Sequence, residues 1–182
     1  KKAQSIAGER LERGRKFCER LNATGEASGM GLYLCAYWAD RMEGKYPEAA
    51  RLYGAAAEHG IAVAQFQLGC CFENGEGVGK DYGEAARWYQ RAAEQGLALA
   101  QNNLGSCFLN GLGVTKDLGE SVRQFRLAAD QGHGPAMYNL GSMYESGFGV
   151  TKNLSEAIGF YRLASELGVA PARIALDRLG QK

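Results

Sequence analysis

Hydrophobic and polar positions along the chain follow a helical period whose pattern restarts every 36 residues. In residues 64–99, Ala64 and Leu68 fall on one face of a first helix. Tyr89 and Ala92 fall on one face of a second helix in the same unit. Each unit therefore predicts a pair of antiparallel helices, and the chain predicts an all-α fold.

The 36-residue unit recurs three times in strict register. The units begin AQFQLGCCFENGEGVGKD at Ala64, AQNNLGSCFLNGLGVTKD at Ala100 and AMYNLGSMYESGFGVTKN at Ala136. One helix pair cannot bury its own apolar face, whereas stacked neighbours can, so the repeats predict one solenoid domain. The predicted divisions are an N-terminal capping helix over 1–27, a degenerate repeat over 28–63, full repeats over 64–99, 100–135 and 136–171, and a C-terminal capping helix over 172–182.

Polar residues and glycines mark the ends of the predicted helices. Asp81, with Glu84 three residues later, has the spacing of a capping box at the start of a second helix. The spacing recurs in the next two units, with Asn in place of Asp in the last one. Gly96 and its equivalents occupy the position of a left-handed C-cap. Between the helices, the sequence G-x-G-V, first at Gly75 and Gly77, predicts a tight connection with positive φ.

A further glycine column lies inside the first helices, at Gly69, Gly105 and Gly141. Glycine costs ~1 kcal/mol relative to alanine in a helix interior, so its recurrence predicts close helix contacts where a side chain would clash. These columns help to explain 26 glycines in 182 residues, about twice the usual share. The first repeat lacks the G-x-G-V sequence, and we expect residues 38–45 to fold differently there.

The motif A-x-x-x-L-G-x-x-[YF]-x-x-G-x-G-V-x-x-D-x-x-E-A-x-x-x-[YF]-x-x-A-A-x-x-G resembles the Sel-1-like repeat, a relative of the tetratricopeptide repeat. The match is strong over residues 64–171, partial over 28–63 and 172–180, and absent before residue 28. The resemblance implies a right-handed α-solenoid that takes part in protein–protein interaction, commonly as an adaptor or assembly factor. It implies no catalytic residues.

Charge and hydropathy argue against two classes of partner. Lys and Arg number 21 against 20 Asp and Glu, and no basic stripe of the kind that binds nucleic acid is present. The longest uncharged run, residues 95–115, is broken by glycines and amides, so we expect no membrane insertion. Residues 1–21 are rich in Lys and Arg but also contain Glu, which favours a solvated helix face.

Three of the five cysteines, Cys35, Cys71 and Cys107, form one column that continues as Met143. Equivalent positions on stacked helices lie ~8–10 Å apart, beyond the ~7 Å between Cα atoms that a disulfide spans. The column therefore predicts apolar packing. Free thiols favour a reducing compartment, such as cytoplasm, mitochondrial matrix or plastid stroma. Bacterial periplasm and endoplasmic reticulum lumen, where relatives of the repeat also occur, stay open.

Candidate catalytic residues are few. The histidines, His59 and His133, fit no zinc spacing and no motif that would activate a thiol. The G-x-G-V sequence does not follow a strand, as a nucleotide-binding loop would. We therefore expect no metal, no cofactor and no enzymatic activity; hydrolysis by a thiol or carboxylate is the enzymatic alternative.

The concave face is the candidate binding surface, because the first helices line it in such solenoids. Opposite the core stripe, the helical wheel places aromatic and apolar side chains beside amides, which suits a peptide or helix lying in a groove. The alternative is that these residues pack between neighbouring first helices and that the amides bond locally. The predicted partner-binding residues are Phe66, Gln67, Asn102, Asn103, Leu109, Tyr138 and Asn139, and Met30, Leu34 and Tyr37 extend the row.

Two functions fit this surface and the solenoid. The first is a non-enzymatic scaffold or adaptor that binds a partner protein or peptide on the concave face. The second is a structural or assembly subunit of a larger multiprotein complex, held through the edges of the solenoid and its N-terminal helix.

Overall fold

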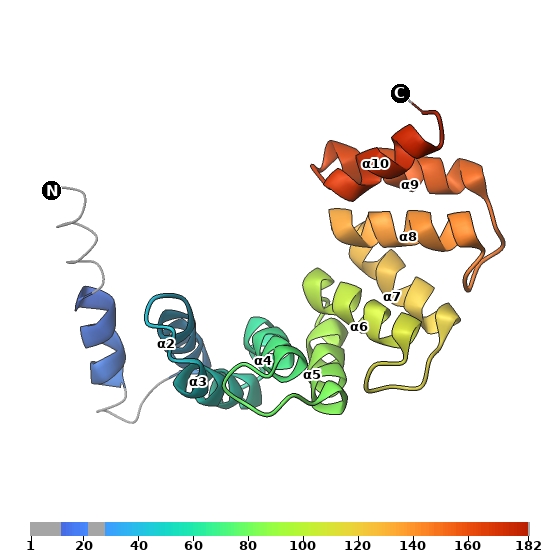
Figure 1. The fold of residues 1–182 in the computed structure, drawn as a ribbon. Helices are drawn as coiled ribbons and strands as arrows, with labels where there is room; N and C mark the ends of the chain where they lie inside the picture. The colour runs from blue at the N-terminus through green and yellow to red at the C-terminus, as the bar shows by residue number, and fades with distance from the viewer. Residues whose placement is uncertain (1–11, 22–27, 182) are drawn as a thin grey trace, which may run out of the picture. The chain divides into compact units, whose positions relative to one another are not determined.

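The computed structural model describes residues 12–21 and 28–181, and every regular element in these ranges is an α-helix. The all-α prediction is confirmed. Residues 12–21 are helical, while the rest of the predicted 1–27 cap and Lys182 lie outside the described residues. The helices that follow are α2 (Gly29–Arg41), α3 (Tyr46–Glu58), α4 (Ala62–Asn74), α5 (Tyr82–Glu94), α6 (Ala98–Asn110), α7 (Leu118–Asp130), α8 (Gly134–Ser146), α9 (Leu154–Glu166) and α10 (Ala170–Arg178) (Figure 1).

The chain divides into two compact units, residues 1–88 and residues 89–182. In the first unit, α2 packs on α3 and α3 packs on α4. In the second unit, α6 to α10 pack in sequence, each on the next. Contacts between consecutive helices are what a stack of helix hairpins produces.

The core of each unit combines small residues with a few large aromatic ones. Ala64 and Ala100 are fully buried, and Tyr53 and Phe125 are the bulky side chains that fill the space between the helices. Alanine lets two backbones approach, and the ring opposite it supplies most of the buried apolar area. The predicted apolar faces of both helices are confirmed.

The caps of the second helices confirm half of the predicted capping box. The Oδ1 atom of Asp117 accepts a hydrogen bond from the backbone N–H of Glu120, at 2.9 Å. The reciprocal bond is not made, because the N–H of Asp117 donates to the carbonyl of Phe108 in the preceding helix, also at 2.9 Å. Glu120 pairs instead with Arg123. The cap therefore also fastens the second helix of a hairpin to the first.

Glycines in the turns have the predicted left-handed backbone. Gly75 and Gly77 have φ of 78° and 75°, and Gly96 has φ of 85°. Gly149, equivalent to Gly77, has a second reason to lack a side chain, because a Cβ atom there would lie 2.4 Å from the carbonyl oxygen of Leu118. The turn thus rests directly on the start of the second helix of the preceding repeat.

Two glycines of the helix-interior column sit where two helices meet. A Cβ atom at Gly105 would lie 2.8 Å from the ring of Phe125, and one at Gly141 would lie 2.6 Å from the ring of Tyr161. Real Cβ contacts are never this short, so the predicted close approach is confirmed at both positions.

The first repeat differs from the others at its turn, as expected. Helix α2 ends at Arg41, whereas the register of α4, which ends at Asn74, would end it at residue 38. Residues 42–45 then join α2 to α3 without the G-x-G-V turn. Trp38 therefore belongs to the helix and does not lie in a loop.

Candidate functional site

The candidate surface is the first-helix face, which we define as the exposed sides of α2 and α4 in the first unit and of α6, α8 and α10 in the second. In the first unit, α2 exposes Met30, Leu34 and Tyr37, at 50%, 48% and 45% of their full area. Their spacing places them one above another on one side of the helix. Large apolar side chains gathered in this way are typical of an interaction surface.

Beside this row, a groove of about 570 Å³ opens between α2, α3 and α4. It contains Phe66 and Gln67, two of the predicted partner-binding residues. The other lining residues are Asp40, Arg41, Tyr46, Tyr53, Cys70, Cys71, Asn74 and Glu76.

Asp40 organises the polar end of this groove. Its Oδ2 atom accepts a hydrogen bond from the hydroxyl of Tyr53 at 3.4 Å and lies 3.3 Å from Nε of Arg41. Burial, followed by the charge of Asp40, raises the pKa of Tyr53, so its hydroxyl remains a donor. The groove can therefore hold a side chain with an apolar body against Phe66 and a polar end near these groups.

In the second unit, the predicted amides bond to one another. Nδ2 of Asn139 on α8 donates to Oδ1 of Asn102 on α6 at 3.0 Å, and Nδ2 of Asn102 donates to Oδ1 of Asn103 at 3.3 Å. These amides join two neighbouring first helices. Such local bonding was the alternative to a role in binding a partner.

Tyr138 and Leu109 are half-buried and contribute to packing in the second unit. The ring of Tyr138 lies 5.6 Å from that of Tyr161, and Leu109 packs against the cluster around Phe125. The hydroxyl of Tyr161 donates to Oε2 of Glu145 at 2.7 Å. The predicted residues thus fall into three groups: Phe66 and Gln67 in a groove, three amides in a bonded row, and two side chains in the packing.

The carboxylates of the groove were not among the residues predicted from the sequence. Asp40 and Glu76 occupy the same register position, 36 residues apart, and the column continues as Leu112 and Phe148. The change along this column, from a charged residue in the first two repeats to an apolar one in the next two, could have pointed to the groove. It was overlooked because Asp40 lies at the end of α2, where the repeat motif fails.

Little in the described residues supports catalysis. Burial raises the pKa of Cys35 and Cys71 to about 12, which keeps both thiols protonated and weakly nucleophilic. Nδ1 of His133 accepts from the N–H of Ala136 at the start of α8, a capping role. Within residues 12–21 and 28–181, no cluster of His, Cys, Asp and Glu is arranged to hold a metal ion.

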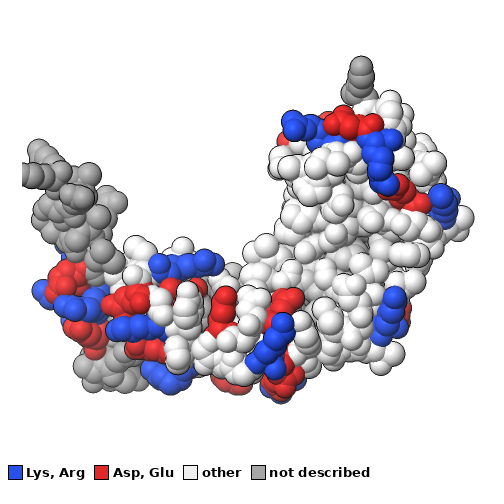
Figure 2. All heavy atoms as spheres, viewed as in Figure 1, with Lys and Arg blue, Asp and Glu red and all other residues white. Residues whose placement is uncertain are grey.

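The described helices also lack the length and apolar content needed to cross a membrane. In the face drawn in Figure 2, Lys and Arg are interspersed with Asp and Glu, and the surface around α8 is largely uncharged. Where this face carries charge, positive and negative side chains therefore lie side by side.

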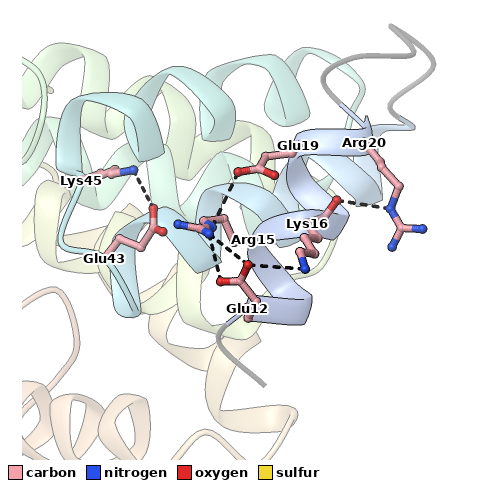
Figure 3. Close-up of polar contacts among 7 residues, drawn as sticks. All are labelled: Glu12, Arg15, Lys16, Glu19, Arg20, Glu43 and Lys45. Carbon is pink, nitrogen blue, oxygen red and sulfur yellow. Dashed lines mark hydrogen bonds and ion pairs between the residues drawn. The ribbon is translucent and has the colours of Figure 1, made fainter. Parts of the chain in front are cut away.

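A second exposed surface is the helix of residues 12–21. Glu12 pairs with Arg15 at 2.9 Å and with Lys16 at 3.5 Å, and Arg15 also lies 3.6 Å from Glu19 (Figure 3). These pairs are exposed and spaced three or four residues apart, as on a solvated helix face. Phe17 is exposed on the same helix.

Comparison with known proteins supports one family. The Sel1 repeat model matches residues 62–97, 98–133 and 134–169, and each range begins at the first residue of a first helix. These ranges start two residues before the units chosen from the sequence, and the division of the chain into caps and repeats stays a prediction. No curated protein matches the chain.

Solved structures match over most of the chain. A Sel1 repeat protein from Oxalobacter formigenes is 31% identical, with a TM-score of 0.80, over 94% of this chain and 71% of that one. The protein c5321, a protective antigen of uropathogenic Escherichia coli with an SLR fold, is 35% identical, with a TM-score of 0.76, over 83% of this chain. This chain spans only 33% of the length of c5321.

Helicobacter pylori cysteine rich protein B, at 22% identity and a TM-score of 0.57, covers 76% of this chain and 99% of its own length, and shows the fold alone. Sel1 repeat proteins generally act in protein–protein interaction and are generally non-enzymatic scaffolds.

Proposed function

The chain belongs to the Sel1 repeat family, and we propose that it is a non-enzymatic adaptor that binds a partner protein or peptide on its first-helix face. The observation that carries the proposal is the exposed row of Met30, Leu34 and Tyr37 beside the groove that contains Phe66. A few anchor residues, aromatic ones above all, contribute most of the binding energy in protein interfaces, and Tyr37 and Phe66 are aromatic residues of this surface.

The first unit is the stronger part of the proposed face. There the apolar side chains are exposed and the groove is open, whereas in the second unit Asn102 and Asn139 already satisfy one another. A partner that broke this hydrogen bond would have to form equivalent hydrogen bonds with the same amides. We therefore assign the contact to α2 and α4.

The test uses peptides selected from a random display library against the full chain. Their dissociation constants are measured by fluorescence anisotropy for the wild type, for Leu34→Ala with Tyr37→Ala, and for Phe66→Ala. Removing these contacts should weaken binding tenfold or more. Leu127→Ala, which shortens an exposed leucine on the second helix α7, is the matched control and should leave affinity unchanged. Equal affinities for all variants would reject the first-helix face.

The second candidate function is assembly into a larger complex through the N-terminal helix. It is favoured by Phe17, an exposed aromatic side chain between the cationic Arg13 and Arg20. Deleting residues 1–21 should release the protein from such a complex, whereas Leu34→Ala with Tyr37→Ala should not. Assembly that survives the deletion would contradict this function.

A further inference from the structure

Two contacts fix how the helix of residues 12–21 lies on α2. A Cβ atom at Gly14 would lie 2.6 Å from the ring of Trp38, so the ring packs directly on the glycine. Near the other end, Cδ1 of Leu21 lies 3.2 Å from the position of a Cβ atom at Gly31. Residue numbers rise along one helix while they fall along the other, so the two helices are antiparallel.

Between these contacts, each helix carries one cysteine. Cys18 lies four residues after Gly14 and three before Leu21, and Cys35 lies four residues after Gly31 and three before Trp38. Spacings of three and four keep a side chain on the same helix face as its neighbours. The two cysteines are therefore placed opposite each other.

The surroundings of the two thiols agree with this placement. Cys18 is half-buried and packs against the core cluster that contains Cys35, which is 3% exposed. Burial, and next a hydrogen bond with the thiol of Cys18, raise the pKa of Cys35 to about 12. Both thiols are free in this structure.

We propose that Cys18 and Cys35 are a site of reversible disulfide formation that fastens the N-terminal helix to α2, with a small-molecule disulfide such as oxidised glutathione as the oxidant. The 16 residues between the two cysteines become a closed loop, which restricts the unfolded chain. The same bond limits the freedom of the helix that carries Phe17.

The reaction proceeds by two thiol–disulfide exchanges. The thiolate of Cys18, the more accessible of the two, attacks one sulfur of oxidised glutathione, forms a mixed disulfide and releases one glutathione thiolate. The Cys35 thiol is mostly protonated, so this second exchange is the slower one: its minor thiolate form, held next to Cys18, attacks Sγ of Cys18 and expels the second glutathione. The two cysteines lose two electrons and two protons in all, and one oxidised glutathione becomes two reduced molecules.

The remaining cysteines lack this arrangement. Cys70 and Cys71 are adjacent in α4, where neighbouring side chains point in different directions. Cys71 and Cys107 lie on separate first helices and are buried. The proposal is thus specific to one pair of the five thiols.

The test treats the full native chain with oxidised glutathione, counts the remaining thiols and maps linked peptides by mass spectrometry. The expected result is the loss of two thiols, a single Cys18–Cys35 cross-link and its reversal by dithiothreitol. The thermal unfolding midpoint of the oxidised chain should exceed that of the reduced chain by about 5 °C or more.

Cys18→Ser is the main variant, because Cys18 is half-buried, whereas Cys35→Ser would place a hydroxyl in the core. Cys18→Ser should abolish both the cross-link and the midpoint shift. Cys70→Ser, which alters another half-buried cysteine, should keep both. Three results would each overturn the proposal: glutathione held on Cys18 without a link to Cys35, a link between other cysteines, or no loss of thiols.

Discussion

At the residue scale, the missing side chain of glycine decides how closely these helices approach. Gly141 on α8 faces the ring of Tyr161 on α9, and no room exists between them for a methyl group. Gly159, also inside α9, has no heavy atom within 4 Å of a built Cβ. One glycine is thus required by packing, whereas the other only lowers helix propensity.

We expect Gly141→Ala to lower the free energy of unfolding by about 1–3 kcal/mol, because the added methyl group must displace a buried ring. Gly159→Ala, the matched control, should leave stability unchanged or raise it by up to about 1 kcal/mol. Urea unfolding of both variants checks this. Equal effects of the two substitutions would show that helix propensity, and not close packing, places the glycine in the column.

His133 links the stability of α8 to pH. Burial lowers its pKa below the usual value, and its neutral Nδ1 accepts the capping hydrogen bond from Ala136. The unfolded chain therefore binds more protons once the pH falls below about 6.5, so this contribution to stability is lost as the pH falls through the lower pKa of the folded state.

The thermal unfolding midpoint should accordingly decrease when the pH is lowered from 7.5 to 5.0. His133→Asn replaces the imidazole by a cap that does not titrate, so part of this fall should disappear in the variant. An identical fall in the wild type and the variant would exclude His133 as a source of the pH dependence.

At the element scale, the turns are built to touch the preceding repeat. Gly149 and Gly132 both have positive φ, at 67° and 82°, but only Gly149 also meets a backbone carbonyl, that of Leu118. Gly132→Ala should cost about 1–2 kcal/mol, the strain of a left-handed alanine. Gly149→Ala should cost at least about 2 kcal/mol more, because backbone atoms must move. Urea unfolding of both variants measures the difference, and equal costs would refute the close approach.

The helices and their ends could be predicted from local spacing, because an apolar period, an N-cap residue and a C-cap glycine all act within a few residues. The reciprocal bond of the capping box could not, because the N–H of Asp117 finds its acceptor at Phe108 only after the hairpin closes. The end of α2 at Arg41 could not be predicted from the sequence either, since no motif marks it.

At the scale of the whole molecule, the repeat motif specifies the stack and leaves the binding surface free to vary. Asn103 and Asn139 could be predicted to share one column of amides, because they are 36 residues apart. The hydrogen bond from Asn139 to Asn102 could not be predicted, because it crosses to the neighbouring column and depends on how closely α6 and α8 approach. The groove beside Phe66 could not be predicted, because it needs three helices and the irregular end of α2.

Binding on the first-helix face is tested most directly by amide hydrogen exchange of the full chain, with and without a saturating concentration of a selected peptide. The peptide should slow exchange in α2 and α4, where the exposed apolar row and the groove lie. Slower exchange confined to the second helices α3, α5 and α7, or to residues 12–21, would contradict binding on the first-helix face.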